Sequence, residues 1–230
     1  MLPLAYALTA LLAYLFGSVP SGFLVARAKG VDIRTVGSKN MGATNVFRVL
    51  GKGPGTLVLL IDALKGALAV LLLPRLLGGL TGPTGSAITI GLPLTAALCA
   101  VLGHNYTCWL KFKGGKGIAT SAGVLAALVP WACLITISVW LIVFAASRYV
   151  SLASVGAASA LPIATALLGA PLPIVCLTLV LGLLAIWKHR PNIDRLIQGT
   201  EHRFGKKKPE ESVPPPGNGT GTAQPPEARP

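Results

Sequence analysis

Charged residues are scarce in this 230-residue chain, and acidic residues are the scarcest. Asp, Glu, Lys and Arg make up 12% of the residues, about half the usual share of a globular domain. The 7 acidic side chains stand against 20 Lys and Arg, so the net charge is +13, while 53% of the residues are hydrophobic. Such a chain is not intrinsically disordered, because disorder requires low hydrophobicity. We also expect no nucleic-acid partner, because a nucleic-acid-binding domain is basic without being this apolar.

Cysteine is rare as well, and no Cys-x-x-Cys spacing occurs. Three of the four cysteines fall within apolar runs; the four are Cys99, Cys108, Cys133 and Cys176. This pattern predicts small apolar packing residues, not a disulfide scaffold. We expect neither a metal site nor a cofactor.

Long apolar runs are what the chain has in excess. A run of roughly 17–25 residues crosses the hydrocarbon core of a bilayer, and a soluble domain of this size could not bury so many apolar side chains in one core. We therefore predict an all-α polytopic integral membrane protein with seven transmembrane helices. The predicted spans are 2–26, 56–77, 87–106, two helices within 117–147, 152–168, and 171–187. The first of these runs is interrupted by Gly17, Pro20 and Gly22, where we expect a kink.

The run 117–147 decides between seven spans and six. As one helix its 31 residues would extend about 46 Å, and Pro130 in its middle predicts two hinged helices. Seven spans place 18 of the 20 basic residues on one side, the exceptions being Lys65 and Arg75. Six spans would divide the basic loops between the two faces. By the positive-inside rule, we expect the N-terminus outside and the C-terminus in the cytoplasm.

The composition changes at the end of the chain. Residues 205–230 are rich in Pro, Gly, Lys and Glu and have little to bury, so we expect a disordered cytoplasmic tail. Residues 1–204 then form the membrane domain.

Two ionisable residues, Asp62 and Lys65, lie inside the second predicted span. They are three positions apart on one helix face and can pair. Ionisable groups in a membrane indicate function by default, although a structural pair that shapes a site is nearly as good an interpretation.

Four polar segments lie on the predicted cytoplasmic side. The first, 37–48, contains small, hydroxyl and amide residues with two cations, and its glycines can present backbone N–H groups to a phosphate; its candidate binding residues are Ser38, Asn40, Thr44, Asn45 and Arg48. A flexible polar connector is the alternative interpretation.

The second segment, 103–120, is rich in glycine where a helix begins, with Lys116 beside it. A helix N-terminus with a nearby lysine favours an anion, and His104 and Asn105 are further candidates. It is not a Walker A loop, because Gly117 follows the lysine where Ser or Thr is required. A basic juxtamembrane stop is the alternative.

The third and fourth segments add hydroxyl, imidazole and amide groups. Ser151 and Ser154, beside Arg148, share a helix face and could bind a second phosphate or only assist helix packing. The fourth segment supplies His189, Asn192 and Glu201 at the membrane surface; a lone histidine there is more often structural.

Taken together, the four segments resemble the bacterial acyl-phosphate:glycerol-3-phosphate acyltransferases, the PlsY type. The resemblance extends from Leu2 to about Glu201 and rests on Gly-Ser-x-Asn-x-Gly-Ala-Thr-Asn-x-x-Arg at 37–48, Gly-His-Asn at 103–105, Gly-Gly-Lys-Gly-x-Ala-Thr at 114–120 and His-Arg-x-Asn-Ile-x-Arg-Leu-x-x-Gly-x-Glu at 189–201. It implies seven transmembrane helices and a cytoplasmic active site in the bacterial inner membrane. Lys39 and Tyr106 stand where relatives often have Gly and Phe.

The resemblance also implies the reaction, the first step of phospholipid biosynthesis. A fatty acyl group moves from acyl phosphate to the 1-hydroxyl of glycerol 3-phosphate, giving lysophosphatidic acid and inorganic phosphate. Ser38, Arg48 and Lys116 would bind the phosphate of glycerol 3-phosphate. Asn192 and His189 would orient the attacking hydroxyl. The acyl-phosphate head would contact the two serines Ser151 and Ser154.

Some alternatives stay open at this level. Either His189 or a substrate phosphate oxygen takes the hydroxyl proton. We expect a monomer in the lipid bilayer, because no oligomer motif is present. An organophosphate or anion transporter is the main alternative function, but it should carry polar residues across the bilayer midplane, where this chain has little besides Asp62 and Lys65. A membrane scaffold with a basic surface would leave the four segments unexplained.

Overall fold

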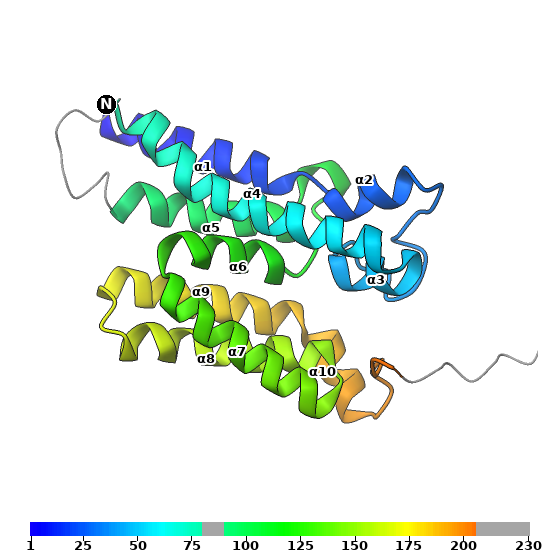
Figure 1. Ribbon diagram of the computed structural model, residues 1–230. Coiled ribbons are helices and arrows are strands. Elements are labelled where there is room, and N and C mark those ends of the chain that lie inside the picture. Colours follow the sequence, from blue (N-terminus) through cyan, green and yellow to red (C-terminus); the bar gives the residue numbers. More distant parts are fainter. Residues whose placement is uncertain (80–89, 206–230) are drawn as a thin grey trace, which may run out of the picture.

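The computed structural model describes residues 1–79 and 90–205. These residues form helices and loops, without a β-strand (Figure 1). The helices are α1 (Leu2–Ser18), α2 (Ser21–Arg27), α3 (Ala43–Leu50), α4 (Lys52–Gly78), α5 (Leu92–Asn105), the 3₁₀-helix η3 (Cys108–Leu110), α6 (Ile118–Leu128), α7 (Pro130–Ser147), α8 (Val150–Leu167), α9 (Leu172–Lys188) and α10 (Arg190–Ile197).

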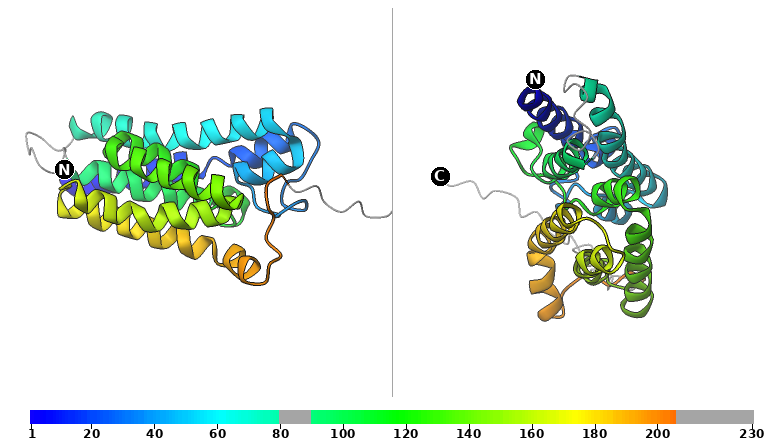
Figure 2. Two further views of the ribbon diagram at one scale, coloured as in Figure 1. Left: turned by 60° about the horizontal axis from the view of Figure 1, so that its bottom comes forward. Right: turned by 90° about the vertical axis from the view of Figure 1, so that its left-hand side faces the viewer.

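The longer helices lie side by side in an elongated bundle (Figures 1 and 2). One group consists of α1, α4 and α5, and the other of α7, α8 and α9. Helix α6 lies between them and contacts α4 on one side and α7 on the other. The bundle therefore has two halves joined through a short central helix.

Two breaks occur where the sequence predicts them. The first apolar run is interrupted at Val19 and Pro20, which separate α1 from α2. The run 117–147 divides into α6 and α7 at Pro130, the first residue of α7. Both predictions are confirmed, and both breaks have one cause: proline cannot continue a hydrogen-bonded helix from the preceding turn.

The seven predicted apolar segments each correspond to helix in the described residues, and fewer than seven have the length and composition of a membrane span. By length and composition, four segments are candidate spans: Leu2–Arg27, Lys52–Gly78, Pro130–Ser147 and Val150–Leu167. Helix α9 becomes a fifth if it is joined with α10 across their 54° bend. Residues 87–89 of the third predicted span and 206–230 of the predicted tail lie outside the described residues.

Glycines allow the helices of the first half to approach closely. A Cβ on Gly66 of α4 would overlap the backbone of Thr120 in α6, and a Cβ on Gly123 of α6 would overlap the backbone of Ala63 in α4. Gly17 of α1 lies in the same way against Ala100 of α5. Small residues at such crossings are typical of membrane helix packing, where close backbone contact stabilises association.

Large apolar side chains cover the outside of the bundle. Leu60, Leu76, Ile142 and Leu172 are all more than half exposed. Exposed apolar surface on this scale marks a membrane-contacting protein. The polar segments lie elsewhere: α2, α3 and α10 gather at the end of the bundle opposite the N-terminus (Figures 1 and 2).

Candidate functional site

The loop before α3 is shaped by Asn45, which lies in the first turn of that helix. Its Oδ1 accepts a hydrogen bond from the Ser38 backbone N–H at 2.8 Å, and its Nδ2 donates to the carbonyls of Ile33 and Val36. Gly37 adopts φ 59, and the carboxamide of Asn45 occupies the space that a Cβ there would need. Asn45 is 1% exposed, so its side chain holds the loop and lies away from the solvent. Ser38 is exposed as a result.

The glycine-rich segment before α6 rests directly on the end of α5. Gly115 N–H donates to the His104 carbonyl at 3.1 Å, and Gly114 N–H donates to the Asn105 carbonyl at 3.2 Å. The side chains of His104 and Asn105 are buried beneath this segment, at 3% and 0% exposure. The structure therefore places these two predicted binding residues under the loop, with Lys116 above them.

Glu201 joins the third and fourth polar segments. Its Oε1 accepts hydrogen bonds from Ser151 Oγ at 2.8 Å and from Asn192 Nδ2 at 2.7 Å, and its Oε2 accepts from Arg195 Nε at 2.7 Å. These bonds hold the pKa of Glu201 below its usual range, although burial opposes them. A carboxylate that accepts several hydrogen bonds stays ionised. The chain after α10 is thereby fastened to the start of α8.

Lys116 is brought to Asn192 from a distant part of the chain, and its Nζ donates to Asn192 Oδ1. Burial lowers the pKa of Lys116 to about 8. The nearby Glu201 carboxylate raises this pKa, whereas the cations Arg195 and Arg48 lower it further. The amide of Asn192 thus bridges the Lys116 ammonium and the Glu201 carboxylate. This bridge unites the second and fourth predicted segments.

Arg48, on α3, faces the same cluster. Burial lowers the pKa of Arg48, Glu201 raises it and Arg195 lowers it further. Among the described residues, nothing accepts a hydrogen bond from the buried Arg48 Nε. A buried guanidinium nitrogen without an acceptor is costly. Three cations around one carboxylate leave a local excess of positive charge that an anion would neutralise.

His189 lies between α9 and α10 and is 3% exposed. Its Nδ1 lies 2.8 Å from the Ala185 carbonyl, which can only accept, so the proton is on Nδ1 and Nε2 carries a lone pair. Burial and the nearby Lys116 lower the pKa of His189 to about 4. At neutral pH the ring is uncharged, and Nε2 can accept a proton.

A pocket of about 240 Å³ opens among these groups. Four predicted site residues line it, namely Ser38, Asn40, Lys116 and Asn192. The other lining residues were not predicted as site residues; they are Trp187, Lys188, Arg190, Pro191 and Arg195. They flank or lie within the 189–201 segment, so its predicted place at the site could have indicated them. No acidic side chain is among the described residues of the lining.

The remaining predicted residues lie outside the lining. Ser154 is 2% exposed; its Oγ donates to the Val150 carbonyl and accepts from Trp140 Nε1, between α7 and α8. Ser151 is turned toward Glu201. Thr44 is exposed at the start of α3. The two serines therefore share a helix but contact different partners.

The fold and this pocket define the class of integral membrane proteins that carry a cationic pocket at one end of a helix bundle. A family model described as "Glycerol-3-phosphate acyltransferase" matches residues 7–199. The chain belongs to this family. The prediction drawn from the four motifs is confirmed.

Curated relatives carry the same name. The glycerol-3-phosphate acyltransferase of Desulforudis audaxviator is 48% identical over 210 residues, which cover 90% of this chain and 100% of the relative. That of Desulforamulus reducens is 47% identical over 197 residues, covering 85% and 94%. These relatives are acyltransferases, so the transporter alternative has no support among them.

The fold also matches solved structures. A crystal structure of PlsY (YgiH), an integral membrane glycerol 3-phosphate acyltransferase in its glycerol 3-phosphate form, has a TM-score of 0.78 and 41% identity, covering 87% of this chain and 96% of that one. The lysophosphatidic acid form of PlsY has a TM-score of 0.76 and 40% identity.

Proposed function

We propose that this chain transfers a fatty acyl group from acyl phosphate to the 1-hydroxyl of glycerol 3-phosphate. The observation that carries the proposal is the cationic pocket, whose lining includes Lys116, Lys188, Arg190 and Arg195 without an acidic side chain among the described residues. Both substrates bring a phosphate to this charge. The pocket volume of about 240 Å³ suits a small polar molecule, while the fatty chain lies against apolar surface within the bilayer.

The reaction is a direct transfer between the two substrates. The glycerol 3-phosphate hydroxyl oxygen attacks the acyl carbonyl carbon, and an ester bond forms as the bond from that carbon to the phosphate oxygen breaks. Inorganic phosphate leaves with the electron pair. The hydroxyl proton passes to His189 Nε2 or to a phosphate oxygen. Because the mixed anhydride has a good leaving group, positioning and charge neutralisation account for most of the catalysis.

The residues divide between binding and orientation. Arg48, Lys116 and Ser38 bind the phosphate of glycerol 3-phosphate, which accepts the hydrogen bond that Arg48 Nε lacks. Asn192, already fixed between Lys116 and Glu201, and His189 orient the hydroxyl. We propose supporting roles for Asn45 and Ser151, which lie outside the lining and hold the segments that carry the binding groups.

We further propose seven membrane crossings in the bacterial inner membrane. The N-terminus lies outside, and the pocket faces the cytoplasm. In support, α6 runs away from the polar end of the bundle and α7 returns to it (Figure 1), so all four polar segments share one side. Helix α6 has 11 residues, about 16 Å of helix, which makes it the shortest of the proposed crossings.

The test is a product assay on the purified protein. Palmitoyl phosphate and glycerol 3-phosphate should yield lysophosphatidic acid and inorganic phosphate in equal amounts. Lys116→Met should abolish most of this activity, whereas Lys113→Met, which changes an exposed lysine of the same loop, should not. Equal activity with palmitoyl coenzyme A, or uptake of glycerol 3-phosphate into vesicles without product, would count against the proposal.

A further inference from the structure

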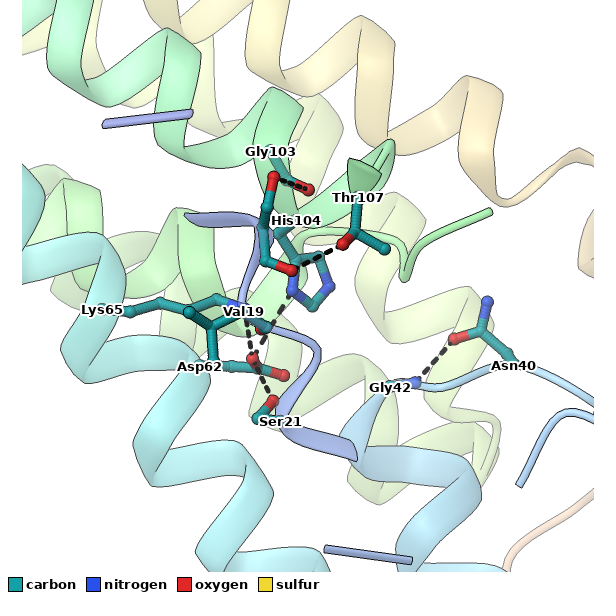
Figure 3. A network of polar contacts seen from close by, with 10 residues as sticks. Val19, Ser21, Asn40, Gly42, Asp62, Lys65, Gly103, His104 and Thr107 are labelled. Atoms are coloured by element: carbon teal, nitrogen blue, oxygen red, sulfur yellow. Dashed lines mark hydrogen bonds and ion pairs between the residues drawn. The ribbon is translucent and has the colours of Figure 1, made fainter. Parts of the chain in front are cut away.

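A buried ionic network lies next to the break between α1 and α2 (Figure 3). Asp62 of α4 pairs with Lys65 at 2.8 Å, with side chains 2% and 4% exposed. This confirms the pairing predicted from their spacing. Charges buried so deeply persist only when they are paired and hydrogen-bonded. The other groups that contact this pair therefore indicate which parts of the fold it holds in place.

The network first supplies hydrogen bonds to backbone carbonyls at the break between α1 and α2. Because Pro20 interrupts the run, the carbonyls of the last turn of α1 lose their helical donors. Lys65 Nζ donates to the Val19 carbonyl at 2.9 Å, and Thr107 Oγ1 donates to the Ser18 carbonyl at 2.6 Å. Asp62 Oδ1 accepts from Ser21 Oγ, in the first turn of α2, at 2.6 Å. The pair therefore fixes α2 in relation to α4.

The network then reaches the loop that carries Lys116. The same Asp62 Oδ1 lies 3.5 Å from His104 Nδ1. The far edge of the imidazole lies against Gly115, where a Cβ would collide with Nε2 and would come within 2.8 Å of Cε1. One carboxylate oxygen thus lies beside an imidazole whose other edge packs against the residue before Lys116.

Helix α2 connects the network to the first polar segment, 37–48. Gly22 of α2 packs against the Met41 carbonyl so closely that a Cβ there would overlap it. In Figure 3, Asn40 and Gly42 lie beside the start of α2, which Ser21 ties to Asp62. Both loops that bring groups to the pocket therefore rest on elements that contact one carboxylate.

We propose that Asp62 and His104 are positioning residues for the acyl transfer. Through Ser21 and Gly115 they set the segment containing Ser38 and the segment containing Lys116 at a fixed separation. Neither side chain lines the pocket. The proposal rests on the proposed function and assigns a new role to His104, a residue expected from sequence to touch substrate.

Substitution of Gly115 tests whether this glycine is required because it packs against the His104 ring or because its backbone contacts a substrate phosphate. If Gly115 is required because the His104 ring lies against it, Gly115→Ala harms the protein only while that ring is present. We expect Gly115→Ala to raise the KM for glycerol 3-phosphate at least tenfold with little change in kcat. His104→Ala alone should raise it threefold to tenfold. The double variant should match His104→Ala within about twofold, because the clash is gone.

Gly114 provides the matched control, because a Cβ there would overlap the backbone of His104 and Asn105 and not the imidazole. His104→Ala should not rescue Gly114→Ala. Asp62→Asn should show the same split, with a higher KM and a retained kcat; a merely unfolded fraction would lower kcat and leave KM unchanged. Binding of glycerol 3-phosphate, followed by its thermal shift, should follow KM.

The outcomes are distinguishable from a failure of the proposed function. An inactive wild type would refute the proposed function itself. An active wild type in which the Gly115 and His104 effects simply multiply would overturn the positioning role and indicate that Gly115 contacts substrate.

Discussion

The buried pair in α4 allows a stability prediction of considerable size. Lys65→Met leaves the Asp62 carboxylate, 2% exposed, without its cation. Removing one partner of a buried pair costs about 3–5 kcal/mol. The Val19 carbonyl also loses the charged one of its two donors and keeps the Ser21 N–H; a hydrogen bond to a charged group contributes about 1.5–3 kcal/mol. Since the two effects overlap, we expect a loss of about 4 kcal/mol in the free energy of unfolding.

The double variant Asp62→Asn/Lys65→Met separates charge from packing. It removes both charges, and the amide oxygen at position 62 can still accept the Ser21 hydroxyl. Replacing a buried pair by neutral groups is often tolerated, unlike removal of one charge. We therefore expect the double variant to recover more than half of the stability that Lys65→Met loses.

Thermal unfolding in detergent, followed by tryptophan fluorescence, is the assay. For a chain of 150–250 residues, 1 kcal/mol shifts the midpoint by about 2–4 °C, so Lys65→Met should lower it by about 8–16 °C. Lys113→Met, at an exposed position, is the control and should stay within 2 °C. A Lys65→Met midpoint equal to the control, or a double variant less stable than both single variants, would refute the reasoning.

Four further predictions concern the pocket. Because the pKa of Lys116 is about 8, its charge is present below pH 8 and is lost above it; kcat/KM for glycerol 3-phosphate should therefore fall above pH 8. Lys116→Arg, whose guanidinium stays charged, should move that decline to higher pH, and an unmoved decline would contradict the assignment. Arg48→Ala should raise the KM for glycerol 3-phosphate at least tenfold; unchanged kinetics would exclude its phosphate contact. Glu201→Gln should lower kcat/KM at least tenfold and also the melting midpoint, because the amide cannot replace the charged bond to Arg195, worth about 1.5–3 kcal/mol; a variant with normal kinetics would show that the cluster tolerates its loss. His189→Ala should lower kcat by about 10²–10⁴ if its Nε2 is the base, and a near-normal kcat would assign the proton to a substrate phosphate.

Local rules explain why much of the fold was predictable. Apolar runs give the helices of a membrane protein, and proline, which lacks a backbone N–H, interrupts two of these runs, at Pro20 between α1 and α2 and at Pro130 between α6 and α7. Pro74 and Pro162, by contrast, lie inside α4 and α8. The Asp62–Lys65 pair is equally local, since three residues of one helix separate its members.

The roles of individual site residues were less predictable, because motif membership does not say which way a side chain points. Asn45 lies in the same polar segment as Ser38, and His104 in the same segment as Lys116, yet the first member of each pair is buried and the second lines the pocket. In each pair the distinction depends on which neighbouring backbone the side chain meets. That information lies in the packing of α3, α5 and the loops.

By itself, the sequence determined that this is a helical membrane protein with basic polar segments of the glycerol-3-phosphate acyltransferase family. Composition, periodicity and motif order are properties of the chain and need no folding to be read. Only the tertiary structure brought Lys116 to Asn192, 76 positions away, and placed Asp62 and His104 beneath the loop. Those contacts arise from close helix packing and the need to satisfy buried charges, and these act only once distant segments have met.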